Sequence, residues 1–132
     1  MNEIWKDIFD YEGIYKISNY GNVKSLRRFR AIRNGGKQLM PEKILKCRPN
    51  IRGYYYVKLC KESKVKTYRI HLLVWDHFGD KPRDGMKLVV DHIDENRLNN
   101  KINNLQLLTN RENLIKSINH KKKRIIIKEM AK

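Results

Sequence analysis

Residues 87–113 of the chain read KLVVDHIDENRLNNKINNLQLLTNREN, and this stretch decides the fold of the C-terminal half. Residues 87–92 are a short run of β-forming residues that ends on two polar side chains, and residues 105–109 can form a second strand. The loop between them is rich in asparagine, which is typical of turns. Thr109 and Asn110 are candidate N-caps of a helix over residues 110–119. The stretch therefore predicts a strand, a long loop, a second strand and a helix.

Four side chains of this stretch point to chemistry: Asp91, His92, Asn104 and Asn113. An imidazole with an ordinary pKa of about 6.5 can take a proton from water at neutral pH. Carboxylate and amide oxygens, as in Asp91 and Asn113, suit a Mg²⁺-type ion that completes its shell with water and phosphate. Because neighbours in a strand point to opposite faces, Asp91 and His92 can share a site only where the strand ends. A base, a metal ion and a phosphodiester together predict hydrolytic cleavage of nucleic acid.

The N-terminal half has the pattern of β-hairpins. Residues 14–28 predict one hairpin around Gly21, and residues 53–60 and 65–70 predict a second one around a polar turn. Residues 27–37 are basic and contain Asn-Gly-Gly, so they form either a mobile loop or the tip of a β-ribbon. Residues 71–78 predict a short apolar helix that ends near Gly79. We expect an α+β fold with a hairpin-rich N-terminal half.

Charge is unevenly distributed along the 132 residues, which carry a net charge of +16. Residues 16–69 carry +14 and residues 116–132 carry +6, whereas residues 70–115 are close to neutral. Two basic segments around a neutral centre indicate a polyanionic partner. The candidate DNA contacts are basic side chains of these two segments: Lys24, Arg27, Arg28, Arg30, Arg33, Lys37, Arg52, Lys58, Lys66, Arg69, Lys121, Lys122, Lys123 and Arg124.

Other classes of protein are excluded by composition. No apolar run approaches the ~20 residues of a membrane span, and no secretory signal is visible at the N-terminus. Cys47 and Cys60 are the only cysteines, too few for a disulfide framework or a four-cysteine zinc site. We expect a cytoplasmic protein, in the cytoplasm of the host cell if a phage encodes it.

The Asp-His pair at 91–92, the asparagine loop and the Asn-Arg-Glu-Asn run at 110–113 resemble the HNH endonuclease motif of the His-Me finger (ββα-metal) superfamily. Residues 70–74 and Phe78 are similar to the helix that precedes this motif in its phage- and intron-encoded homing branch. Residues 3–26, EIWKDIFDYEGIYKISNYGNVKSL, resemble an N-terminal modular segment often joined to such nucleases. The resemblance covers most of residues 3–118.

The resemblance implies roles for the four side chains. His92 would be the general base, and Asn104 would span the loop by hydrogen bonds and keep His92 oriented. Asp91 and Asn113 would hold one divalent ion, Mg²⁺ or Mn²⁺. The last letter of the motif is Asn rather than His here, which leaves the preferred metal open. The product would be a nick in double-stranded DNA, with a 5′-phosphate and a 3′-hydroxyl.

The resemblance also divides the chain into a basic DNA-docking segment over residues 1–69, a nuclease motif with its preceding helix over 70–118, and a basic tail over 119–132. No membrane or small-molecule substrate is expected. Monomer and dimer both remain open.

Two other functions remain possible at this point. A non-catalytic basic nucleic-acid-binding protein would explain the charge equally well, but not the spacing of Asp91, His92, Asn104 and Asn113. A restriction or toxin nuclease would differ only in its biology. His71 and His77 lie in an apolar pattern and are expected to pack rather than to bind metal. Tyr54 to Tyr56 are expected to pack in a sheet rather than to stack on bases.

Overall fold

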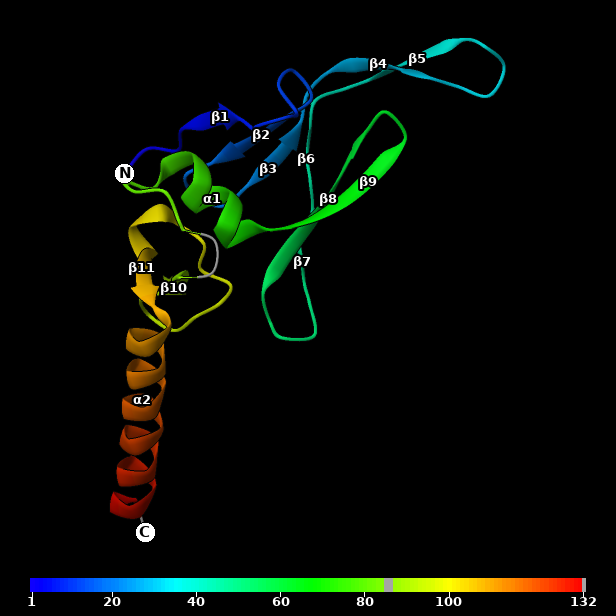
Figure 1. The fold of residues 1–132 in the computed structure, drawn as a ribbon. Helices are drawn as coiled ribbons and strands as arrows, with labels where there is room; N and C mark the ends of the chain where they lie inside the picture. The colour runs from blue at the N-terminus through cyan, green and yellow to red at the C-terminus, as the bar shows by residue number, and fades with distance from the viewer. Residues whose placement is uncertain (85–86, 132) are drawn as a thin grey trace.

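The computed structural model describes residues 1–84 and 87–131. Its N-terminal sheet has the strand order β1-β2-β3-β6, and its neighbours pair antiparallel (Figure 1). These strands are β1 (Trp5–Asp7), β2 (Tyr15–Ser18), β3 (Val23–Ser25) and β6 (Lys43–Ile44). The hairpin predicted over residues 14–28 is therefore confirmed as β2 and β3. Gly21 in its turn has a φ of 89°, which glycine adopts at little cost.

Two further antiparallel units follow. A two-stranded ribbon of β4 (Arg28–Ala31) and β5 (Lys37–Met40) projects away from the rest of the chain (Figure 1), so the basic stretch forms a ribbon rather than a loop. A three-stranded sheet has the order β7 (Arg48–Pro49), β8 (Tyr55–Lys61) and β9 (Lys64–Arg69). The turn between β8 and β9 consists of Glu62 and Ser63, both with positive φ, as in the type I′ turns that suit a twisted hairpin.

The helix α1 (Ile70–Phe78) contacts strands of both halves of the chain and confirms the predicted apolar helix. Its residues Ile70 and Val74 are fully buried. They belong to one core with Ile17 of the N-terminal sheet, Leu59 of β8 and Leu105 of the C-terminal half. Because apolar burial drives folding, residues 1–69 and 70–118 depend on each other for stability.

The C-terminal half contains the predicted strand, loop, strand and helix. Strand β10 (Leu88–His92) pairs antiparallel with β11 (Leu105–Thr109), and a short 3-10 turn covers Ile102–Asn104. Helix α2 (Asn110–Met130) begins directly after β11. The Thr109 hydroxyl accepts a hydrogen bond from the backbone N–H of Glu112 at 3.1 Å, which confirms Thr109 as the N-cap.

The prediction that this helix ends at residue 119 is wrong. The helix continues through the basic segment to Met130 and leaves no flexible tail over the described residues 119–131. Residues 110–130 contain no glycine or proline, and Lys, Arg, Glu and Met favour helices. Within the part of the chain that the structure describes, neither helix is long and apolar enough to cross a membrane.

Candidate active site

A cleft of about 600 Å³ opens between β10, the asparagine loop and the first turns of α2. Its lining includes three of the four predicted side chains, Asp91, His92 and Asn113. The remaining lining residues are mostly polar or charged: Tyr54, Val89, Val90, Asp94, Glu95, Asn96, Arg97, Lys116, Ser117, His120 and Arg124. Strand β10 ends at His92, so Asp91 and His92 reach one cleft at a strand end, as the sequence requires.

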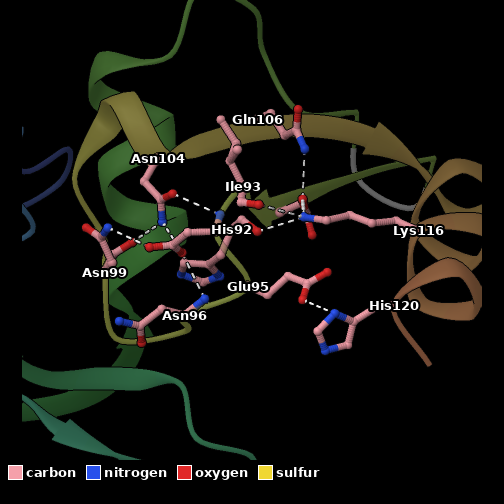
Figure 2. Close-up of polar contacts among 11 residues, drawn as sticks. His92, Ile93, Glu95, Asn96, Asn99, Asn104, Gln106, Lys116 and His120 are labelled. Carbon is pink, nitrogen blue, oxygen red and sulfur yellow. Dashed lines mark hydrogen bonds and ion pairs between the residues drawn. The ribbon is translucent and has the colours of Figure 1, made fainter. Parts of the chain in front are cut away.

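Asn104 closes the asparagine loop. Its side-chain oxygen accepts a hydrogen bond from the backbone N–H of Asp94 at 3.1 Å. Its amide nitrogen donates to the Asp94 carboxylate at 2.9 Å and to the carbonyl of Asn99 at 2.8 Å (Figure 2). Hydrogen bonds from the Asn99 side chain, the backbone N–H of Asn96 and the Asn104 side chain lower the pKa of Asp94. Asp94 and Asn104 together hold the loop in one conformation.

His92 is buried at the end of β10, and its Nε2 lies 2.7 Å from Oδ1 of Asn100. The hydrogen bonds of the Asn104 side chain go to Asp94 and Asn99, so the side chain that bonds the His92 ring is Asn100. The two tasks expected of Asn104, spanning the loop and orienting His92, are therefore shared between two asparagines. Asn104 spans the loop, and Asn100, which the sequence did not single out, contacts the ring directly.

Two aromatic side chains, His71 and Tyr54, lie beside the His92 ring. The ring of His71 lies 5.1 Å from it, and the ring of Tyr54 stacks on His71 at 4.9 Å. Burial, with a smaller contribution from the His92 ring, lowers the pKa of His71 to about 3. His71 therefore stays neutral at physiological pH. It packs as predicted, although Nδ1 of His71 is buried without a hydrogen-bond partner among the described residues.

Asp91 lines the cleft and contacts two side chains. One carboxylate oxygen accepts a hydrogen bond from Gln106 at 2.9 Å and lies 2.6 Å from Nζ of Lys116. The same Lys116 ammonium donates to the carbonyl oxygens of His92 at 2.8 Å and Ile93 at 3.3 Å (Figure 2). Three oxygens thus converge on one cation.

The donor set fits a hard divalent ion with few protein ligands. No group of three His, Cys, Asp or Glu side chains that could hold a metal occurs within residues 1–84 and 87–131. Mg²⁺, however, often takes only one or two protein oxygens and fills its remaining positions with water and phosphate. The Asp91 carboxylate already contacts a cation, and Asn113 faces the same cleft from α2. These residues are therefore suitable ligands for Mg²⁺ or Mn²⁺.

Positive side chains border the cleft beside this oxygen cluster. The guanidinium of Arg97 lies 4.6 Å above the ring of Tyr54 and donates to the backbone carbonyl of Arg52 at 2.5 Å. Arg124 lines the cleft from α2, and His120 pairs with Glu95 on the same side (Figure 2). Arg97 was not among the predicted DNA contacts because it lies in the nearly neutral segment.

The predicted DNA contacts fall into two groups. Lys24 lies over the ring of Trp5 and 3.7 Å from Glu42. Arg28 donates to the carbonyl of Ile14 and to the hydroxyl of Ser25, so both Lys24 and Arg28 stabilise the fold. The other predicted contacts are exposed on the ribbon, the β7-β8-β9 sheet and α2: Arg27, Arg30, Arg33, Lys37, Arg52, Lys58, Lys66, Arg69, Lys121, Lys122, Lys123 and Arg124.

Two family models match the chain, one over its N-terminal half and one over its C-terminal half. Residues 3–60 match the NUMOD4 motif. Residues 68–115, which include α1, the asparagine loop and the start of α2, match the HNH endonuclease family.

Relatives and a solved structure agree with these matches. The chain is 37% identical over 110 residues to DNA endonuclease I-HmuI of Bacillus phage SP01, an alignment that covers 83% of this chain and 55% of that protein. It is 30% identical over 103 residues to H-N-H endonuclease F-TflII of Escherichia phage T5. That alignment covers 78% of this chain and 47% of the phage protein.

A solved structure of I-HmuI, described as "DNA binding and cleavage by the HNH homing endonuclease I-HmuI", matches with a TM-score of 0.71 and 35% identity. The match covers 95% of this chain and 66% of that one. The chain thus spans about half the length of these two curated relatives. The chain belongs to the HNH endonuclease family and carries a NUMOD4 motif ahead of its HNH segment.

Proposed function

We propose that the chain is a divalent-metal-dependent endonuclease that nicks double-stranded DNA, with His92 as its general base. The observation that carries this proposal is the position of His92, bonded to Asn100 and open to the same cleft as Asp91 and Asn113. The names of its relatives support the reaction, since I-HmuI and F-TflII are both called endonucleases.

The hydrogen bond to Asn100 supports one tautomer of the neutral His92 ring. An amide oxygen only accepts, so Nε2 of His92 carries the hydrogen and Nδ1 keeps the lone pair. A neutral imidazole in this tautomer can take a proton from water through Nδ1. The oxygen of that water then attacks the phosphorus, the bond to the 3′ oxygen breaks, and the 3′ oxygen takes a proton from solvent water. The products are a 5′-phosphate and a 3′-hydroxyl.

Asp91 and Asn113 are the proposed ligands of one Mg²⁺ or Mn²⁺ ion. When bound, the ion supplies positive charge to the phosphate and to the leaving 3′ oxygen. Gln106 holds the Asp91 carboxylate from the neighbouring strand, and Asn104 fixes the loop that carries Asn100. One such site in each chain accounts for the cutting of one strand.

The basic surfaces are proposed to hold the duplex. The β4–β5 ribbon presents Arg30, Arg33 and Lys37 to solvent. On α2, Arg124 lines the cleft and Lys121 is exposed. Residues 1–69 thus act as the docking segment and the basic part of α2 as a second contact. Their phosphate contacts are sequence-independent and position the DNA over His92. We place this activity in the cytoplasm of the host cell.

The test is incubation of the purified chain with supercoiled plasmid and Mg²⁺ or Mn²⁺, followed by EDTA. We expect relaxed plasmid with either ion, no cleavage with EDTA, and no cleavage by the Asp91→Ala variant. The exposed carboxylate of Asp80 provides the control, since Asp80→Ala removes the same group away from the cleft. Binding of plasmid without cleavage under all conditions would instead support a non-catalytic DNA-binding protein.

A further inference from the structure

Lys116 occupies an unusual position for a lysine of an exposed helix. Its ammonium lies 2.6 Å from the Asp91 carboxylate and within 3.3 Å of the carbonyl oxygens of His92 and Ile93. The Lys116 side chain is 26% exposed and that of Asp91 is 14% exposed. Since water screens such a partly buried pair less than a surface pair, the attraction between these two groups is substantial.

Lys116 and Asn113 lie three residues apart on α2, so their side chains share one face of the helix. Both line the cleft. The helix therefore directs a proposed metal ligand and a positive charge toward the same carboxylate. The three oxygens around the Lys116 ammonium are hard ligands of the kind that Mg²⁺ and Mn²⁺ prefer.

We propose that Lys116 is an internal competitor of the divalent ion for Asp91. In the metal-free protein its ammonium neutralises the Asp91 carboxylate, and it must move away before the ion can bind there. The physical reason is the repulsion between an ammonium and a divalent ion that contact the same carboxylate within a few ångströms. This inference rests on the proposed metal site at Asp91 and Asn113, and it adds a residue that sets the affinity of that site.

The test measures Mn²⁺ binding to the DNA-free chain by titration calorimetry, independently of cleavage. The Lys116→Met variant keeps the length of the side chain and removes its charge. We expect this variant to bind Mn²⁺ about fivefold or more tightly than the wild type, because the change removes both the ammonium that occupies the Asp91 carboxylate and its repulsion of the ion. Lys128→Met is the matched control, because it removes an exposed charge from the same helix at a residue outside the predicted DNA contacts, and it is expected to change the affinity much less.

A second variant, Lys116→Gln, tests the same point with a polar side chain, and thermal unfolding in EDTA shows that each variant is folded. Equal or weaker Mn²⁺ binding by both Lys116 variants, with binding lost in Asp91→Asn, would overturn the inference and leave the proposed metal site intact. Lys116 would then position Asp91 rather than compete for it. Absence of binding in every variant would overturn the proposed metal site together with this inference.

Discussion

Asn100 contacts both the turn of the N-terminal hairpin and the His92 ring. Its side-chain oxygen bonds Nε2 of His92 at 2.7 Å, and its Cβ would lie 2.9 Å from a Cβ added at Gly21. The backbone carbonyl of Asn19 in the same turn accepts a hydrogen bond from Ile102 at 2.9 Å. The N-terminal segment thus supports the loop that orients the proposed base, besides carrying charges for DNA.

Asn100→Ala should lower the cleavage rate by about 10- to 100-fold, because the His92 ring loses the bond that selects its tautomer. DNA affinity should stay close to that of the wild type. Asn103 is exposed in the same loop, so Asn103→Ala serves as the control and should cleave normally. Single-turnover cleavage at saturating DNA is the measurement, and equal rates for both variants would remove Asn100 from the site.

Gly21→Ala should destabilise the chain by about 1–3 kcal/mol and lower cleavage, because a positive φ and a close contact with Asn100 combine there. Gly35 has a φ of 74° but open space around it. Gly35→Ala therefore measures the backbone cost alone, about 1 kcal/mol. Urea unfolding compares the two. If Gly35→Ala costs as much as Gly21→Ala, the packing of Gly21 on Asn100 contributes nothing.

His71 should make stability fall in mild acid. Its pKa is about 3 in the folded chain and 6.5 in the reference state, so the unfolded chain binds a proton first as the pH falls. The contribution of His71 is complete above pH 6.5 and is lost between pH 6.5 and 3, at up to about 1.4 kcal/mol per pH unit. His71→Phe should flatten this dependence in unfolding experiments. An unchanged slope between pH 7 and 4 would show that His71 does not cause it.

The exposed arginines of the ribbon region should set the salt dependence of DNA binding. Replacing Arg27, Arg30 and Arg33 with Gln should weaken binding to every sequence and reduce the slope of log K against log salt by up to about three. Arg28→Gln should instead lower the melting temperature, because Arg28 bonds Ile14 and Ser25 within the fold. Fluorescence anisotropy at several salt concentrations tests this. A slope unchanged by the triple variant would mean that the duplex is held elsewhere.

The elements that the sequence predicted are those with a strong local pattern. The β8–β9 hairpin follows from the alternation of apolar and basic residues, and α1 follows from an apolar run that ends at Gly79. The far end of α2 was missed, because residues 119–132 were interpreted as a basic tail that contacts DNA although nothing in residues 119–130 stops a helix. The ribbon was ambiguous because residues 27–37 alternate basic and apolar residues only over 28–31, and the Asn-Gly-Gly run at 34–36 suits a loop as well as a ribbon tip.

The sequence predicted the side chains proposed to react or to bind metal, but not the residues that contact and orient them. Asp91, His92 and Asn113 stand out by residue type and spacing, and the structure brings them to one cleft. Asn100 did not stand out, because the asparagines of one loop are chemically equivalent in a sequence and only the folded loop selects one. Lys116 resembled any lysine of an exposed helix, since its contact with Asp91 spans 25 residues.

The most direct measurement is single-turnover cleavage of duplex DNA by His92→Ala, with DNA affinity measured on the same preparation. We expect the rate to fall by about 10²–10⁴-fold while affinity changes only a few-fold, because His92 acts on water and makes few binding contacts. A variant that keeps more than about a tenth of the wild-type rate would contradict His92 as the general base.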